Sequence, residues 1–180
     1  MLFSLDWLRD YVDLPEAPAQ IARRLTAAGL AVDGIEEKDG DAVFDIDVTT
    51  NRPDAMNHLG LARELAVLFE RPLRPPQVAL AESGETVSSA VRSIAVADPE
   101  GCPRYVARVV TGVRVGEGPA WLRKRLSAIG LRSINNLVDV TNYVLWETGQ
   151  PLHAFDLRKL AGPALVIRRA ADGERLTTLD

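Results

Sequence analysis

The sequence predicts an α+β fold in which a small N-terminal domain of helices and a hairpin is followed by the first part of a mixed α/β domain. Apolar residues recur with helical spacing near the start, and Phe44, Ile46 and Val48 alternate with polar residues as in a half-buried strand. Both patterns return after residues 71–90, a stretch of proline, serine, glycine and glutamate with no period of its own. That stretch is expected to be a linker between two domains.

Residues 1–70 contain the elements of the predicted N-terminal domain. Ser4 can cap a first helix through residues 5–12, and a second helix is expected at about residues 18–29. Two strands that flank the sequence KDGD predict a hairpin. A third helix is expected to start at about Asp54, whose carboxylate can cap it.

The predicted second domain covers residues 91–180, after the linker at 71–90. Its expected order is two strands, two helices and two further strands. These elements are expected at about residues 91–97, 105–115, 119–129, 137–148, 164–170 and 175–180. The last strand stops at Asp180 with no covering element, and an open sheet edge of that kind is unfavourable. This pattern indicates a truncated chain.

Composition places the chain among ordinary soluble proteins and limits its partners. Of the 180 residues, 47% are apolar and 26% are charged. Because the net charge is −4, a nucleic acid would need a local basic patch. The single cysteine, Cys102, excludes an internal disulfide, and we interpret it as a structural thiol. No apolar run approaches membrane-spanning length and no signal-peptide pattern opens the chain, so we expect a cytoplasmic protein without membrane contact.

Three polar residues in and after the helix expected at 137–148 are candidates for function. At about 100° per residue, Thr141 falls in the middle of an apolar face and Asn142 at its edge, so we expect the helix to be buried around them. A bond from the Thr141 hydroxyl to the carbonyl of Leu137 would be a purely structural explanation. A buried Asn142 amide needs several partners, and His153 could face solvent, cap a turn or line a pocket.

Other polar groups have simpler interpretations. His58 is expected on a helix face. Arg123, Lys124 and Arg125 lie together near a tryptophan and could contact phosphate, although the same pattern is usual for a solvated helix face. The sequence contains no phosphate-binding glycine loop, no nucleophile elbow and no zinc-protease motif. Residue patterns alone therefore indicate a soluble, two-part α+β protein.

Five sequence blocks follow one another along nearly the whole chain: FSLDWLRDYV, AAGLAVDGIE, DVTTNRPDAMNHLGLARELAVL, CPRYVARVV and INNLVDVTNYVLWETGQPLHAFD. In this order they resemble the β-subunit family of bacterial phenylalanine–tRNA ligases. The last block is long and is not a general fold pattern, and NRPD followed by GLAREL is a second, independent match. Only KDGD stands where the family usually carries an oligonucleotide-binding-type insertion, so a short variant is expected and tRNA contacts of that insertion do not carry over.

The resemblance implies an architecture and a set of partners. Residues 1–70 would form the N-terminal domain of the β subunit, and residues 91–180 would begin its editing domain, of the B3/B4 type. Aminoacylation would belong to the α subunit with ATP and Mg²⁺, so no residue here would be catalytic for it and this part would bind no cofactor or metal. The implied partners are the α subunit, in a heterotetramer, and tRNA(Phe), which implies RNA binding.

The resemblance also implies a role for the three candidates. A hydrophobic phenylalanine pocket rejects tyrosine by only about 10²-fold, because tyrosine merely adds a hydroxyl, so a second site must hydrolyse Tyr-tRNA(Phe). By resemblance, Thr141, Asn142 and His153 line this editing pocket, and the chain alone is expected to be inactive or nearly so. A free-standing editing hydrolase and a non-catalytic interaction module remain alternatives; the NRPD-containing N-terminal part argues against the first.

Overall fold

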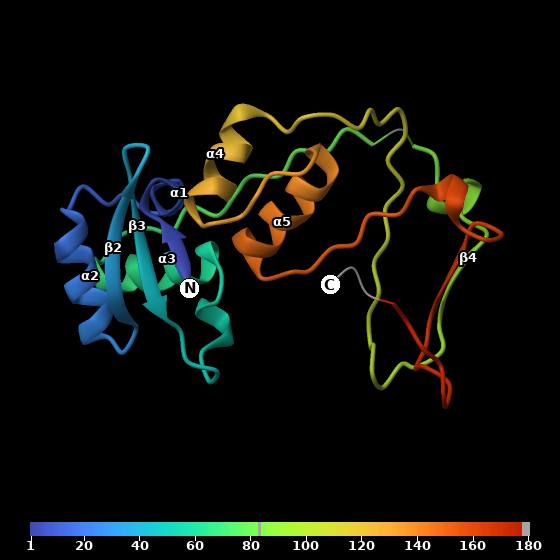
Figure 1. The fold of residues 1–180 in the computed structure, drawn as a ribbon, viewed down its shortest axis with the longest axis horizontal. Helices are drawn as coiled ribbons and strands as arrows, with labels where there is room; N and C mark the ends of the chain where they lie inside the picture. Colours follow the sequence, from blue (N-terminus) through green and yellow to red (C-terminus); the bar gives the residue numbers. More distant parts are fainter. Residues whose placement is uncertain (83, 178–180) are drawn as a thin grey trace. The chain divides into compact units, whose positions relative to one another are not determined.

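The computed structural model describes residues 1–82 and 84–177, and its mixture of helices and small sheets confirms the predicted α+β class. The described residues form two compact units (Figure 1). The first unit contains residues 1–79 and 114–154, and the second contains the described parts of 80–113 and 155–180. This grouping differs from the linear division predicted above, because residues 114–154 pack with the N-terminal part. Domain boundaries near residues 70 and 90 stay a prediction.

A three-stranded antiparallel sheet lies at the centre of the first unit. Its strands, in spatial order, are β1 (Leu2–Ser4), β3 (Asp41–Asp47) and β2 (Ala31–Lys38). The predicted hairpin is confirmed, and its connecting residues Asp39 and Gly40 have φ angles of 50° and 79°, as a type I′ turn requires. β1 is absent from the sequence prediction because three residues show no period; it pairs with β3, and Phe3 lies opposite Phe44.

Helices pack around this sheet in the first unit. They are α1 (Leu5–Arg9), α2 (Pro18–Ala27) and α3 (His58–Leu68), with a 3₁₀ turn η1 (Pro53–Ala55) before α3. Ser4 caps α1 as predicted, because its hydroxyl accepts a hydrogen bond of 3.1 Å from the Trp7 amide. Gly29, with φ of 92°, ends the predicted second helix in the left-handed conformation that glycine favours.

The cap predicted at Asp54 is wrong. Pro53 opens a 3₁₀ turn, so the α-helix begins later, and the Asp54 carboxylate binds the Arg52 guanidinium at 2.9 and 3.0 Å. Asn57 caps α3 instead, since its side-chain oxygen accepts from the Gly60 amide at 2.7 Å. Both residues are good capping types, and the proline decides which one is used.

The core of the first unit lies between the sheet and the helices. α1 contacts β3 and α3, and α2 contacts β2 and α3. The large side chains that are fully buried include Phe3, Trp7, Leu8, Ile21, Leu25, Phe44, Ile46, Leu61 and Leu65. Burying one such side chain stabilises a fold by about 1.5–3 kcal/mol. Some polar groups are buried as well; among them, the Asp41 carboxylate accepts hydrogen bonds from the Ser4 hydroxyl at 2.5 Å and the Asp6 amide at 2.9 Å.

Two further helices belong to the first unit. In the sequence they come after residues 80–113, which begin the second unit. They are α4 (Ala120–Ala128) and α5 (Asn136–Thr148). α4 contacts β1 and α5, and α5 contacts α3 (Figure 1). α4 falls within its predicted range and α5 begins one residue before its own, so the prediction of their existence and type is confirmed.

The second unit is built around two parallel strands. These are β4 (Ser93–Val96) and β5 (Ala164–Ile167), which confirm two of the predicted strands; 3₁₀ turns lie at η2 (Val87–Ser89) and η3 (Leu157–Lys159). The strand predicted at 105–115 is wrong. Among the described residues no strand pairs with this segment, and Val106 and Val110 are 67% and 75% exposed, so it lacks the neighbouring strand that it would need. Of the last predicted strand, residues 175–177 form no regular element and 178–180 lie outside the described residues.

Candidate functional site

Both ends of α5 are fixed by specific interactions. At the start, the Asn135 side-chain oxygen accepts hydrogen bonds of 3.1 Å from the amides of Leu137 and Val138. The buried Asp139 carboxylate holds the preceding loop by accepting from the Ser133 hydroxyl at 2.6 Å and the Ile134 amide at 2.9 Å. At the other end, Gly149 has φ of 80° and closes the helix as predicted.

The two faces of α5 have different surroundings. One face, with Asp139, Tyr143 and Trp146, packs against the rest of the first unit. The opposite, apolar face is only partly covered by described residues: Val140 is 48% exposed and Leu145 is 37% exposed. The prediction of a buried helix is therefore wrong, since only Asp139 of its residues is fully buried.

Thr141 and Asn142 lie next to each other on this helix, and both are half-buried. The Thr141 hydroxyl donates a hydrogen bond of 2.8 Å to the carbonyl of Val138, one residue along from the Leu137 carbonyl that helix periodicity suggested. Within the described part of the chain, the Asn142 amide makes no side-chain hydrogen bond. The Thr141 hydroxyl hydrogen is therefore already donated, but the hydroxyl oxygen can still accept a hydrogen bond from a ligand. The Asn142 amide can both donate to a ligand and accept from it.

His153 lies on the segment into which α5 leads. It follows Gly149 in an irregular stretch, and its side chain is exposed. The structure thus brings Thr141 and Asn142 together on one helix and places His153 beyond the end of that helix. Sequence spacing predicts this arrangement because Gly149 ends the helix before the histidine.

Stacked rings hold α5 against the N-terminal part of the first unit. The Trp7 ring stacks on the rings of His58 and Tyr143, with centroid distances of 3.8 and 4.5 Å. Trp121 of α4 contacts the same tyrosine edge-on at 5.3 Å. The stack joins α1, α3, α4 and α5, and aromatic pairs of this kind contribute about 0.5–1.5 kcal/mol each beyond their burial.

A chain of polar groups accompanies the rings. The Trp7 indole donates to the Tyr11 hydroxyl at 2.9 Å, and that hydroxyl donates to the Glu147 carboxylate of α5 at 2.5 Å. The Tyr143 hydroxyl donates to the same carboxylate at 3.2 Å. Burial, followed by the hydrogen bond to Glu147, raises the pKa of the Tyr11 phenol; burial also raises the pKa of Tyr143. Both phenols therefore stay protonated and act as donors.

Sequence patterns do not predict this network. Trp7 and Tyr143 are far apart in the sequence, and no periodic pattern links them. The available signal is chemical: a buried tryptophan or tyrosine needs a partner for its polar tip, and Glu147 lies one helical turn from Tyr143.

The basic cluster of α4 is largely engaged within the first unit. Arg123 binds the Glu117 carboxylate, and Arg125 binds the Asp10 carboxylate, each at 2.5 Å. Arg125 also donates to the Tyr143 hydroxyl at 3.0 Å. Arg125 thus links α4 to the end of α1 and to α5, whereas Arg123 binds the loop before its own helix. Both pairings favour the structural interpretation of the run over a phosphate site.

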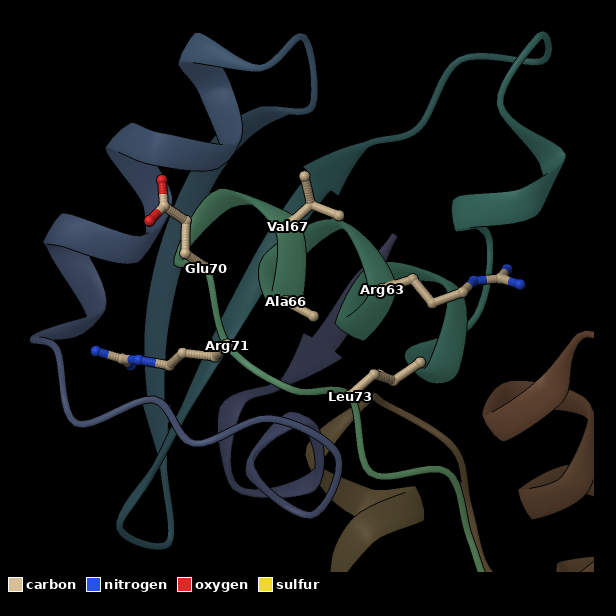
Figure 2. A pocket seen from close by; sticks show the side chains of 6 residues that line it. All are labelled: Arg63, Ala66, Val67, Glu70, Arg71 and Leu73. Atoms are coloured by element: carbon tan, nitrogen blue, oxygen red, sulfur yellow. The ribbon is translucent and has the colours of Figure 1, made fainter.

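A shallow pocket of about 490 Å³ lies at the C-terminal end of α3 and does not include the three candidates. Figure 2 shows the side chains that line it: Arg63, Ala66, Val67, Glu70, Arg71 and Leu73. Arg71 points toward α2 and binds the Glu16 carboxylate, with contacts of 2.5 and 2.7 Å. That pairing lowers the pKa of Glu16, so one of the two arginines that line the pocket is already neutralised by an acid.

Two kinds of feature are absent from the described residues. No cluster of three or more histidine, cysteine, aspartate or glutamate side chains there is arranged to hold a metal ion. Of the helices in residues 1–82 and 84–177, none has the length and apolar character needed to cross a bilayer.

Comparison with known proteins gives the class and then the family. Residues 101–180 match the family model of the B3/4 domain. A phenylalanine–tRNA ligase beta subunit from Rhodopirellula baltica is 46% identical over 182 residues, which cover 100% of this chain and 26% of that relative. Beta subunits of the same name from Anaeromyxobacter dehalogenans and Geobacter sulfurreducens are 52% and 51% identical over 140 residues, 78% of this chain and 17% of each relative. The chain belongs to the phenylalanine–tRNA ligase β-subunit family.

The chain spans about a quarter or less of the length of these relatives. The match to the Rhodopirellula baltica relative uses 182 positions for a chain of 180 residues. It therefore leaves no room for a large insertion at KDGD, and the short connection between β2 and β3 is shared with that relative.

Proposed function

We propose that this chain is part of the β subunit of a phenylalanine–tRNA ligase and contributes, with an α subunit, to the aminoacylation of tRNA(Phe) in the cytoplasm. The proposal is supported by the name that the relatives share and by 46% identity across the whole chain. The whole enzyme would use ATP and Mg²⁺, neither of which would be bound by these 180 residues. Assembly into an α/β heterotetramer belongs to the same proposal.

The finer part of the proposal is hydrolytic editing of Tyr-tRNA(Phe) on α5. Its main support is the partly uncovered face of this helix, where Thr141 lies among apolar side chains and Asn142 offers an amide without a side-chain bond in the described residues. Polar groups set in an apolar surface suit a ligand that is itself part apolar and part polar, such as the tyrosyl ester at the end of a tRNA.

The hydrogen-bonding state of each group limits its role. Because the Thr141 hydroxyl donates to Val138, it can only accept from a ligand, for example from the ammonium group of tyrosine or a ribose hydroxyl. Asn142 can both donate and accept, and could hold the ester carbonyl or the ribose. His153 would orient the ester or the attacking water by position more than by proton transfer.

The test uses the complete reading frame that contains residues 1–180, co-expressed with its α subunit. Asn142→Ala and His153→Ala are expected to lower deacylation of Tyr-tRNA(Phe) by at least about tenfold, the effect of losing roughly 1.4 kcal/mol of positioning. Aminoacylation with phenylalanine should stay within about twofold of wild type, because α5 would not contact that site. Asn51→Ala is the matched control, since it removes the same amide from an exposed turn of the first unit.

Normal tyrosine clearance by both variants would contradict the editing assignment. The 180-residue chain should be tested alone in the same assay. Rapid deacylation by the chain alone would favour the free-standing hydrolase, and loss of aminoacylation together with deacylation would point to a general structural role.

A further inference from the structure

His58 lies where the start of α3 meets the end of α5. It is the first residue of α3, and its side chain is fully buried. Its ring stacks on Trp7 at a centroid distance of 3.8 Å with an angle of 21° between the planes. The ring of Phe3 lies 5.2 Å away on another side. Only the two ring nitrogens are therefore left to interact with polar groups.

Both nitrogens have a backbone partner, and these partners determine the tautomer. The Ser4 amide donates to Nε2 at 3.2 Å, so Nε2 carries no proton. In the neutral ring the proton then sits on Nδ1, which donates to the Trp146 carbonyl at 2.9 Å. Burial keeps the ring neutral by lowering its pKa to about 3.

The Trp146 carbonyl is one of the last carbonyls of α5, which have no partner inside the helix. If the helix continued, the Gln150 amide would donate to this carbonyl. In the structure, that amide donates to the Thr148 hydroxyl at 3.2 Å instead. His58 therefore supplies the missing donor from a different helix. Asn57 lies close to the same turn, since a Cβ atom added at Gly149 would be 3.1 Å from its amide nitrogen.

We propose that His58 is a positioning residue: it caps the C-terminal end of α5 from outside and so fixes the helix face of Thr141 and Asn142 and the segment that leads to His153. The catalytic consequence rests on the proposed editing function, whereas the anchoring of α5 does not. Editing would depend on this anchor because a displacement of about 1 Å at a reacting group can cost about a hundredfold in rate.

Two substitutions at this position separate the hydrogen bonds from the ring. His58→Phe keeps a flat ring against Trp7 and removes both bonds, while His58→Asn keeps a donor near the place of Nδ1. In the complete α/β enzyme, His58→Phe is expected to lower kcat for Tyr-tRNA(Phe) deacylation by about tenfold to a hundredfold with KM little changed. Aminoacylation should stay within about twofold, and His58→Asn should recover part of the loss.

Hydrogen exchange measured on the same enzymes reports the anchoring itself. In His58→Phe the amides of residues 145–149 should exchange at least about tenfold faster, because the last turn of α5 opens more often. Unchanged exchange would overturn the anchoring, and faster exchange with normal deacylation would overturn the catalytic consequence. If Asn142→Ala, run in parallel, also clears tyrosine normally, the editing function fails and exchange alone decides the role of His58.

A measurement on the unmodified protein covers the case in which His58→Phe does not fold. Nitrogen NMR of ¹⁵N-histidine-labelled protein distinguishes the two neutral tautomers. A neutral ring with the proton on Nδ1 supports the cap. A proton on Nε2, or a charged ring at pH 7, would overturn it.

Discussion

The neutral, buried His58 makes stability depend on pH in a range where few other groups titrate. Burial lowers its pKa to about 3 in the folded state, against about 6.5 in an unfolded chain. Between these values the unfolded state binds a proton that the folded state does not. The stability contributed by the neutral His58 ring is therefore fully present only well above pH 6.5 and decreases as the pH falls toward 3.

The size of the effect follows from the two pKa values. Between pH 7 and pH 5, protonation of the unfolded chain at His58 lowers the free energy of unfolding by about 2 kcal/mol. Acids whose pKa is lowered by pairing, such as Glu16 and Asp54, contribute below about pH 4.5 and so lie outside this interval. The chain contains one other histidine, His153.

Urea unfolding followed by tryptophan fluorescence can measure this change. All three tryptophans, Trp7, Trp121 and Trp146, lie in the first unit with His58. Wild type and His153→Gln should both lose about 2 kcal/mol between pH 7 and pH 5, whereas His58→Asn should lose little. Parallel pH profiles for wild type and His58→Asn would refute the reasoning.

Two further predictions concern the first unit and use unfolding in urea at pH 7. Ser4→Ala removes both the cap of α1 and a donor to the buried Asp41 carboxylate, so it should cost about 2–3 kcal/mol; a loss below about 0.5 kcal/mol would show that neither bond matters. Gly60→Ala should cost at least about 2 kcal/mol, because the new Cβ would lie 1.8 Å from the Asp54 carbonyl oxygen, whereas Gly34→Ala has open space and should stay within about 1 kcal/mol. Equal stability of the two alanine variants would contradict the packing at Gly60.

The sequence predicts the elements whose signals are local. The hairpin follows from alternation around a turn with Asp39 and Gly40, and the cap of α1 follows from Ser4 ahead of an apolar run. The strand predicted at 105–115 fails for the opposite reason. Alternation describes what a strand would bury, and a strand also needs a neighbour, which no local pattern supplies.

For the candidate site, too, the sequence predicts local features but not the contacts between distant residues. Helical spacing places Thr141 and Asn142 on adjacent positions of α5, but it predicts burial, whereas the structure leaves their apolar face partly exposed. The interactions that hold the opposite face depend on residues distant in the sequence. His58 shows this best: the sequence suggests a helix face, and its partners Ser4 and Trp146 are known only from the fold.

A crystal structure of the complete enzyme with a non-hydrolysable tyrosyl-adenosine amide would test the editing proposal most directly. This analogue carries the tyrosine and terminal ribose of the tRNA. Its ester-equivalent group is expected to lie within hydrogen-bonding distance of the Asn142 amide, on the face of α5 that contains Thr141. Binding of the analogue away from α5, with Asn142 still free of contact, would contradict the proposed site.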